Sequence, residues 1–345
     1  MAKSLKYSDA GVDIEVWNLA KRRIGELVSS TFTGDVIGGF GQFGGMFSAA
    51  SLKKMDDPVL VSSTDSVGTK VKVAFETGIH SSVGEDIVNH CINDILVLGA
   101  RPLFFLDYIG INKLIPAVAE QIIQGLARAC KAGGCVLIGG ETAEMPAVYS
   151  AGEYDLVGCI VGVVNKGGIV DGHTIAAGDI AIGLRSSGLH TNGYSLARKI
   201  VREVAGKRYG DLFEPADKSF GEVLLTPHRA YGPVLRLMDR GLIKGCAHIT
   251  GGGFQDNVDR ILPGGCDAVI DTKAWMPDPI YEFLQKAGNV ESDEMYHTFN
   301  MGVGMVLVVD SKNAEAALNA PEITTFEPRV IGRVVKGAGK VILEY

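Results

Sequence analysis

The chain has 345 residues, of which 46% are hydrophobic and 21% are charged, so neither a single small module nor a disordered protein is expected. Its 33 basic and 40 acidic residues leave a net charge of -7, which lacks the basic footprint of a nucleic-acid-binding protein. The amino terminus has no apolar core of signal-peptide length, and no apolar run reaches the roughly 18 residues of a membrane span. We therefore expect a cytoplasmic protein of two domains.

Glycine is the unusual residue, because its 45 positions are nearly twice the usual share of about 7%. Such an excess indicates many places where the backbone turns with positive φ or approaches a bulky group closely. The six cysteines are scattered and form no CxxC pair, so they suggest neither a zinc site nor a disulfide framework.

Predicted helices and strands alternate along the first half. A helix is expected over residues 12–30, and the glycine-rich loop IGGFGQFGGMF follows it. The strands PVLVSST, PLFFLDYIG, CVLIGG and YDLVGCIVGVV come next, with helices over residues 83–100 and 114–133 between them. A polar, glycine-rich run over residues 165–179 is the best candidate for a domain junction.

The second half alternates in the same way, from the strand DIAIGL to a final strand pair, RVIGRVV and KVILEY. The fold class predicted is therefore α/β with mixed sheets in both halves. We expect one domain over residues 1–168 and a second over residues 169–345.

The glycine-rich loop contains a GxGxxG pattern at Gly39, Gly41 and Gly44, and Asp65 follows at the distance of a ribose-binding carboxylate. A dinucleotide fold needs a strand directly before these glycines and a helix directly after them, and neither is predicted. A flap that closes over phosphates fits better, and an ordinary surface loop remains equally open.

The helix over residues 83–100 carries Asp86, His90, Asn93 and Asp94 within one sector. A solvated polar face explains such a stripe as well as a binding site does. Asp107 is different, because its neighbours in LFFLDYI read as a strand buried on both faces, and a buried carboxylate needs a partner.

Acidic side chains recur beside the glycine-rich turns, at Asp65, Asp94, Asp107 and Glu141. They would repel a triphosphate, since two like charges 4 Å apart cost about 4 kcal/mol at an effective dielectric constant of 20. A divalent cation removes the conflict, and Mg²⁺ prefers carboxylate and phosphate oxygens. The pattern thus indicates a magnesium nucleotide; a purely structural cation would leave Lys70 and the glycines unexplained.

Two loops of the second half join a strand to a helix start and leave backbone amides free. The first, RSSGLHTNGYSL, offers Ser187, His190, Thr191 and Asn192, and the second, HITGGGFQDN, offers Gly251, Gly252 and Gly253. Both suit the phosphate of a small substrate. His190 is a candidate for proton transfer, although a turn histidine satisfied by the backbone is as good an interpretation.

Taken together, the motifs resemble those of the phosphoribosylformylglycinamidine cyclo-ligase family, also called aminoimidazole ribonucleotide synthetases. The resemblance runs along nearly the whole chain and rests on DAGVD at positions 9–13, GGFGQFGG, STDSVGTK, the pair Asn93 and Asp94, PLFFLDY, GGETAEMP, SSGLHTNGYSL, TGGGFQDN and EMYHTFNMGVGM. Gln42 departs from the family pattern, where another glycine is expected.

The resemblance implies ATP-dependent ring closure in purine biosynthesis, with Mg²⁺ as cofactor and a ribonucleotide as substrate. It also implies a homodimer whose amino-terminal sheets join into a barrel. The resemblance implies four groups of site residues: Asp65, Lys70, Asp94 and His190 in catalysis; Gly39, Gly41, Gly44, Lys70, Asn93, Asp107 and Glu141 at the nucleotide; Ser187, His190, Thr191, Asn192 and Gly251 to Gly253 at the ribonucleotide; and Asp65, Asp94, Asp107 and Glu141 at the metal.

Three rival interpretations remain at this point. The first is another ATP-using enzyme of the same fold, such as a small-molecule kinase or a selenophosphate synthetase. The second is a nucleotide-sensing dimer without catalysis, and the third is a nicotinamide oxidoreductase.

Overall fold

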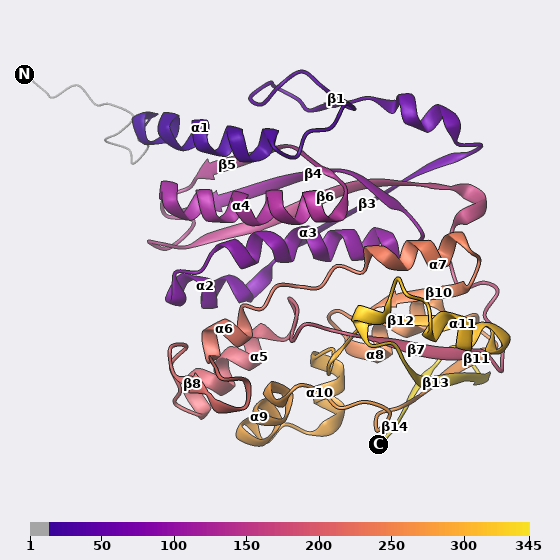
Figure 1. Cartoon of the computed structure of the whole chain (residues 1–345). Coiled ribbons are helices and arrows are strands. Elements are labelled where there is room, and N and C mark those ends of the chain that lie inside the picture. The colour runs from indigo at the N-terminus through magenta and orange to yellow at the C-terminus, as the bar shows by residue number, and fades with distance from the viewer. Residues whose placement is uncertain (1–13) are drawn as a thin grey trace, which may run out of the picture.

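The computed structural model describes residues 14–345, in two halves that each contain one main sheet (Figure 1). The motif DAGVD at positions 9–13 lies outside the described residues. Short helical turns aside, the elements of the first half are α1 (Ile14–Ser29), β1 (Val36–Ile37), β2 (Met46–Phe47), β3 (Pro58–Ser66), α2 (Val71–Thr77), α3 (Ser81–Leu96), β4 (Arg101–Ile111), α4 (Pro116–Gly133), β5 (Val136–Glu144) and β6 (Tyr154–Asn165). Those of the second half are β7 (Ile180–Arg185), α5 (Tyr194–Lys199), β8 (Leu212–Phe213), β9 (Lys218–Ser219), α6 (Phe220–Leu224), α7 (Leu235–Asp239), β10 (Ile243–His248), α8 (Gly253–Val258), β11 (Cys266–Asp271), α9 (Pro279–Gly288), α10 (Ser292–Thr298), β12 (Val303–Val309), α11 (Ala314–Leu318), β13 (Arg329–Lys336) and β14 (Val341–Glu344).

The first half is built on a four-stranded mixed sheet in the order β3-β6-β4-β5. β6 is antiparallel to both β3 and β4, whereas β4 and β5 are parallel. The helices α3 and α4 pack side by side against the sheet. Buried and partly exposed residues alternate along β6, which is the pattern of a strand with one face toward a core.

Glycine explains how closely α3 and α4 approach each other. A Cβ atom at Gly84 would lie 2.2 Å from the carbonyl oxygen of Ile122, and one at Gly125 would lie 1.9 Å from that of Ser81. Only a residue without a side chain fits at either position. Part of the glycine excess in the sequence is thus a packing requirement.

The second half contains a six-stranded sheet in the order β10-β12-β7-β13-β11-β14. Both predicted final strands are present, as β13 and β14, and they lie on opposite sides of β11. The Asp267 carboxylate accepts hydrogen bonds from the backbone N–H groups of Ala338 and Lys340, at 2.7 and 2.8 Å. These bonds hold the turn after β13 over β11, so the chain returns along the far side of that strand.

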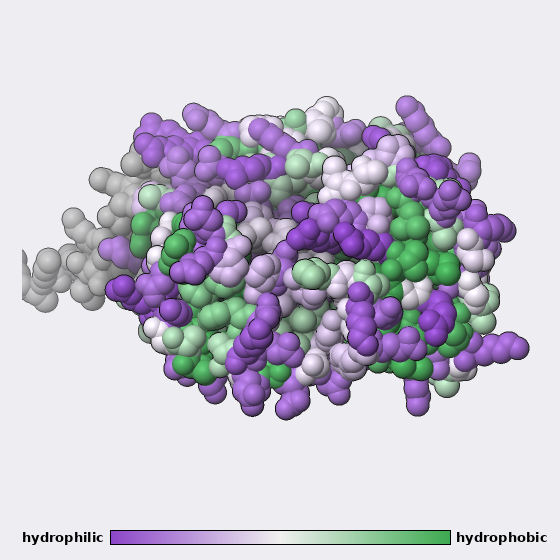
Figure 2. Space-filling model, turned by 60° about the horizontal axis from the view of Figure 1, so that its bottom comes forward, coloured by the Kyte–Doolittle hydropathy of each residue, from purple (hydrophilic) through white to green (hydrophobic). Residues whose placement is uncertain are grey.

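The segment between β6 and β7 contains no strand of either main sheet, as the predicted junction requires. The boundary between residues 168 and 169 stays a prediction. Seen from the side of the second half, the surface mixes many hydrophilic side chains with hydrophobic patches (Figure 2). Among the described residues, no helix has the length and hydropathy needed to cross a membrane.

Candidate active site

Most of the predicted site residues line one of two cavities, and these cavities have no lining residue in common. The first, of about 580 Å³, is lined by Gly39, Gly41, Gly44, Asp107 and Glu141 among others. The second, of about 920 Å³, lies between the two halves and is lined by Asp65, Asp94, Thr191, Asn192 and Gly251 among others. The four acidic residues therefore form two pairs, and the expected single cluster is not what the subunit shows.

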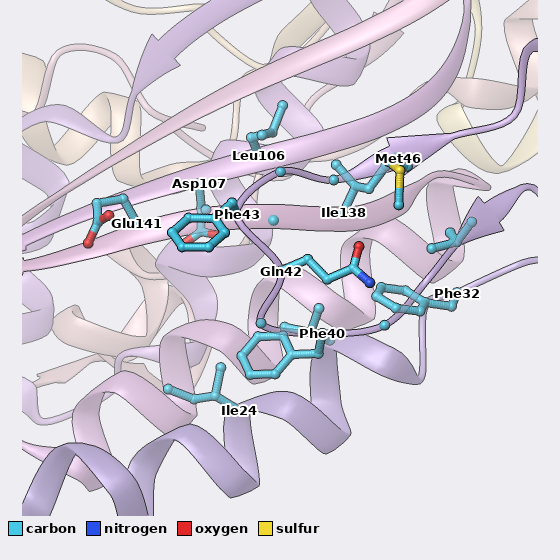
Figure 3. A pocket seen from close by; sticks show the side chains of 18 of the residues that line it. Ile24, Phe32, Phe40, Gln42, Phe43, Met46, Leu106, Asp107, Ile138 and Glu141 are labelled. Carbon is cyan, nitrogen blue, oxygen red and sulfur yellow. The ribbon is translucent and has the colours of Figure 1, made fainter.

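The first cavity combines an apolar wall with two carboxylates. Ile24 from α1 and the loop residues Phe40 and Phe43 supply apolar surface, while Asp107 on β4 and Glu141 on β5 supply charge (Figure 3). An apolar wall with a few placed polar groups is typical of a small-molecule site. The cavity suits a ligand with a flat apolar part and a charged part.

The glycine-rich loop connects β1 to β2, which pair antiparallel, and thus forms the end of a hairpin. Gly38 and Gly41 have φ values of +89° and +90°, which side chains rarely adopt. A Cβ atom at Gly38 would lie 2.5 Å from the amide nitrogen of Gln42, so Gln42 folds back over that glycine. Phe43 near the tip is fully exposed. That the loop closes over phosphates as a flap stays a prediction.

Asp107 is a buried carboxylate without a basic partner among the described residues. Burial raises its pKa to about 7, and the nearby charge of Glu141 acts in the same direction. A Cβ atom at Gly140 would lie 2.3 Å from Asp107 Oδ1, so the glycine before Glu141 leaves room for the acid. A bound cation would offset the cost of burying the Asp107 charge and the repulsion between Asp107 and Glu141.

In the second cavity, His90 from α3 lies between the two other acids. His90 Nε2 is 2.8 Å from Asp65 Oδ2 and 3.5 Å from Asp94 Oδ2. Asp94 Oδ1 is also 2.9 Å from His248 Nδ1, at the end of β10. Burial would raise the pKa of both carboxyls, but the neighbouring histidine rings outweigh it and hold each pKa below its ordinary value.

The polar stripe of α3 is not a solvated face. Asp86, His90 and Asn93 are all buried, and Asp94 is mostly so. Asn93 was expected at the nucleotide, yet its amide nitrogen donates to the carbonyl of Arg229 at 2.8 Å and its oxygen accepts from Tyr231 N at 3.0 Å. The polar stripe of α3 therefore faces the second half and forms hydrogen bonds with its backbone.

Lys70 needs a correction, because its position does not fit a phosphate ligand. Its ammonium group is completely buried and forms an ion pair of 2.9 Å with Asp86. It also donates to the carbonyl oxygens of His190 at 2.9 Å and Thr226 at 2.8 Å. All three N–H bonds are used, so none is left for a phosphate.

His190 is also buried and does not line the second cavity. It therefore does not suit the expected role in proton transfer. The residue adopts φ of +58°, its ring stacks on His228 at 3.9 Å, and its Nε2 accepts from the backbone N–H of Ser187 at 3.1 Å. Burial lowers the pKa of His190 well below its ordinary value, and neighbouring cations act in the same direction. The alternative of a buried turn histidine describes it better.

The remaining loop residues divide in two. Thr191, Asn192 and Gly251 line the second cavity, whereas the hydroxyl of Ser187 donates to the carbonyl of Pro227 at 2.6 Å. Gly252 and Gly253 are not among its lining residues. A Cβ atom at Gly253 would lie 1.8 Å from the Tyr296 carbonyl oxygen, so this glycine permits close packing.

Sequence reasoning gave no role to three residues of this region. His228 and His248 belong to the same buried histidine cluster as His90 and His190, and Arg260 lines the second cavity. The signal available for His248 was its place at the end of a strand directly before the triple-glycine turn. No comparable signal marked His228, because only the fold brings it beside α3.

The pair Asp107 and Glu141 and the pair Asp65 and Asp94 differ in how well they suit Mg²⁺. This cation prefers oxygen ligands to nitrogen ligands. Asp107 and Glu141 fit, because the buried Asp107 carboxyl has a raised pKa and Glu141 beside it has no ion-pair partner within residues 14–345. Asp65 and Asp94 already face histidine nitrogens. The first pair is therefore the better place for a hard cation.

Comparisons with known proteins agree with this architecture. Two family profiles match, the amino-terminal domain of AIR synthase related proteins over residues 48–164 and its carboxy-terminal domain over residues 176–344. The phosphoribosylformylglycinamidine cyclo-ligase of Geotalea uraniireducens is 48% identical over 96% of this chain and 95% of its own length. Further cyclo-ligases are 45 to 49% identical.

Solved structures share the fold at low sequence identity. The thiamine-monophosphate kinase of Stenotrophomonas maltophilia is 16% identical with a TM-score of 0.67, over 92% of this chain and 94% of that one. The hydrogenase maturation protein HypE in complex with ATP is 16% identical with a TM-score of 0.61, over 99% and 92%.

The two mixed-sheet halves and the cavity between them define an α/β protein of the AIR synthase related class. Within this class, the chain belongs to the phosphoribosylformylglycinamidine cyclo-ligase family.

Proposed function

We propose that this protein is an ATP-dependent cyclo-ligase that converts formylglycinamidine ribonucleotide to aminoimidazole ribonucleotide in purine biosynthesis, with release of ADP and phosphate. The observation that carries the proposal is the identity of 45 to 49% with cyclo-ligases over nearly the whole of both chains. Acceptance of another substrate, as by a kinase of the same fold, is the nearest alternative.

The proposed nucleotide site is the first cavity, with Gly39, Gly41 and Gly44 near the phosphates and Mg²⁺ held by Asp107 and Glu141. When bound, this ion would neutralise phosphate charge next to the two carboxylates. The support is the raised pKa of Asp107 and the absence of a basic partner for it among the described residues.

The proposed ribonucleotide site is the second cavity. Thr191, Asn192 and Gly251 line it, and Arg260 supplies a positive charge for the substrate phosphate. Asp65 and Asp94 lie on the wall of the same cavity and are the acids proposed to act at the reacting atoms.

In the proposed reaction, the formyl oxygen of the substrate attacks the terminal phosphorus of ATP and ADP leaves. An amidine nitrogen then attacks the activated carbon, the carbon–oxygen bond breaks and inorganic phosphate departs. The residues of this chain position the two substrates and stabilise charge, and no protein nucleophile is needed. The two cavities have no common lining residue, so we propose that closure of the glycine-rich loop or a second subunit brings the two substrates together.

The test is an assay of the purified protein with ATP, Mg²⁺ and formylglycinamidine ribonucleotide, in which aminoimidazole formation and phosphate release are followed together. We expect the two products in equal amounts. Phosphate release without aminoimidazole would indicate a different acceptor, and ATP binding without phosphate release would indicate a nucleotide sensor.

We also propose that two copies pair through the face of the first sheet that carries half-exposed apolar side chains. Leu60 on β3 is 62% exposed, and Phe104, Leu106 and Tyr108 on β4 are partly exposed. Apolar patches of this kind on a sheet are typical of interfaces. In light scattering, Leu60→Glu should give a monomer, whereas Met276→Glu, at an exposed apolar position of the second half, should stay a dimer.

The cytoplasmic location and the division into residues 1–168 and 169–345 remain predictions of the same proposal. Expression of each range alone would test the division, because each should unfold cooperatively if it is a domain.

A further inference from the structure

Lys70 is buried in the core, so another positive group is needed to face the phosphates in the first cavity. Asp107 and Glu141 line this cavity, and the phosphates of a nucleotide would add further negative charge beside them. The two charges of one Mg²⁺ ion do not balance both sets. A basic side chain at the same cavity would supply the remaining attraction.

Lys21 of α1 is such a side chain. Among the described residues that line the first cavity, it is the only one with a positive charge. Its ammonium group forms no ion pair or hydrogen bond with a described side chain, and the residue is exposed. Lys21 therefore differs from Lys70, which uses all three N–H bonds within the protein. Its charge is available to a ligand.

Lys21 lies on the helical side of the cavity. It precedes Ile24 by three residues, so the two side chains share one face of α1. Figure 3 shows Ile24 on the helix, apart from Asp107 and Glu141 on the strands. A ligand between helix and strands can thus contact the lysine on one side and a cation held by the two acids on the other.

The glycine-rich loop packs on this face of α1. A Cβ atom at Gly25 would lie 2.9 Å from Phe40 Cδ1, so the Phe40 ring occupies the space where Gly25 lacks a side chain. A Cβ atom at Gly41 would lie 3.8 Å from Lys21 Cε, an ordinary van der Waals distance. Phe40 therefore anchors the loop on the helix, and the end of Lys21 lies beside Gly41.

Two other glycines of the loop keep the cavity wall bare. Gly39 and Gly44 line the cavity, neither has a positive φ, and a Cβ atom at either would meet nothing within 4 Å. Neither the backbone nor the packing of the single subunit requires glycine there. A bare backbone lets a phosphate approach the N–H groups closely, and a lysine beside such a loop is a common phosphate ligand.

We propose that Lys21 is a phosphate-binding residue of the nucleotide site, with its ammonium group in contact with the phosphates beside Gly41. The inference rests on the proposed function, because it takes the first cavity as the nucleotide site. It deepens that function by naming the basic residue of the site, a role that sequence reasoning gave to Lys70.

The neighbouring arginines offer a different explanation and a matched control. Lys21, Arg22 and Arg23 are consecutive, and such a run can attract any anion through its general field. Arg23 already pairs with Glu120 at 3.0 Å, and Arg22 does not line the first cavity. Removal of Arg22 takes away the same charge one position further along, without loss of a contact in the cavity.

The test is calorimetric binding of adenosine, AMP, ADP and ATP to the full-length protein in excess Mg²⁺, without the ribonucleotide. Lys21→Met keeps an apolar side chain of similar length and removes the charge. We expect its affinity for ATP to fall by about 10- to 100-fold, as when a hydrogen bond to a charged group is lost, and its affinity for adenosine to stay. Lys21→Arg should recover most of the ATP affinity, and Arg22→Met should change it by less than about 3-fold.

A second measurement locates the contact. Brief acetylation followed by mass spectrometry should show that ATP with Mg²⁺ protects Lys21 and leaves the exposed Lys336 of β13 unprotected. Circular dichroism should show that Lys21→Met is folded, since the residue is exposed and unpaired among the described residues.

Four results would overturn the inference: an unchanged ATP affinity in Lys21→Met, equal losses for adenosine and ATP, equal losses in Lys21→Met and Arg22→Met, or no ATP binding by the folded wild-type chain. The aminoimidazole assay on the same preparations separates this inference from the proposed reaction. ATP binding through Lys21 without aminoimidazole would keep the inference and exclude the reaction. Aminoimidazole formation with an unaffected Lys21→Met variant would do the reverse.

Discussion

At the scale of single residues, Asp94 has the most demanding position, because its two oxygens face different histidine rings from the two halves. Asp94→Asn keeps the shape of the side chain and removes its charge. We expect turnover to fall by at least about 100-fold, the usual effect of removing one placed charge or donor at a reacting centre. The aminoimidazole assay measures this, with Asp57→Asn, at an exposed position, as the control.

The fold should survive this change, because the asparagine amide still fills the site. A melting temperature within a few degrees of the wild-type value would show that activity and not folding is lost. Unchanged turnover in Asp94→Asn would remove this residue from the catalytic group.

His190 makes a second prediction at this scale, which concerns pH. Burial holds its pKa well below 6.5 in the folded protein, so at mildly acidic pH the unfolded chain binds a proton that the folded chain does not. Its contribution to stability is therefore present above pH 6.5 and is lost as the pH falls, by up to about 1.4 kcal/mol per pH unit. Urea unfolding from neutral pH down to about pH 5 measures the slope.

His190→Gln should flatten that slope, whereas His297→Gln, at an exposed position of α10, should not. An unchanged slope in His190→Gln would mean that other buried groups account for the acid sensitivity.

At the scale of elements, the contact between α3 and α4 sets a limit on side-chain size. Gly125→Ala would place a Cβ atom 1.9 Å from the Ser81 carbonyl oxygen, and a backbone atom cannot swing away. We expect a loss of about 1 to 3 kcal/mol in the free energy of unfolding, as for other overpacked cores. Gly264→Ala, where a Cβ atom meets nothing within 4 Å, should change stability little.

The long elements could be predicted from the sequence because their periodicity is strong. The strands of the first sheet and both of its helices lie where the apolar pattern put them. The short elements α6 and α10, with five and seven residues, give too little periodicity to detect. The order of the strands was not predicted, as β13 and β14 show, because it depends on turn contacts such as those of Asp267.

The sequence predicted which residues belong to the candidate site, but not how they are grouped in space. The motifs led to Asp65, Asp94, Asp107 and Glu141, but the assumption that acids near glycines meet at one point was wrong for the single subunit. Lys70 shows the physical reason. A lysine beside glycine and hydroxyl residues has the same sequence signature whether it reaches a ligand or fills the core.

At the scale of the whole molecule, Lys70 joins the two halves. Its buried ammonium group pairs with Asp86 within the first half and donates to two carbonyl oxygens of the second half. Lys70→Met would leave the Asp86 carboxylate buried and unpaired, which typically costs about 3 to 5 kcal/mol. Urea unfolding should show this loss, and the double variant with Asp86→Leu should recover part of it.

The matched control is the exposed ion pair between Lys286 and Glu282 on α9. Lys286→Met should leave stability nearly unchanged, since surface pairs contribute little. Equal effects of the two methionine variants would mean that water reaches the buried pair.

The Lys70 contact has a consequence for how substrates reach the interior. If the two halves moved apart about a hinge, the Lys70 ammonium would have to leave the carbonyl oxygens of His190 and Thr226 before water could replace these bonds. Such a hinge is therefore the costly route of entry. Substrates can instead enter through the opening of the second cavity, or past the exposed hairpin tip at Phe43. Neither route breaks the contacts of Lys70.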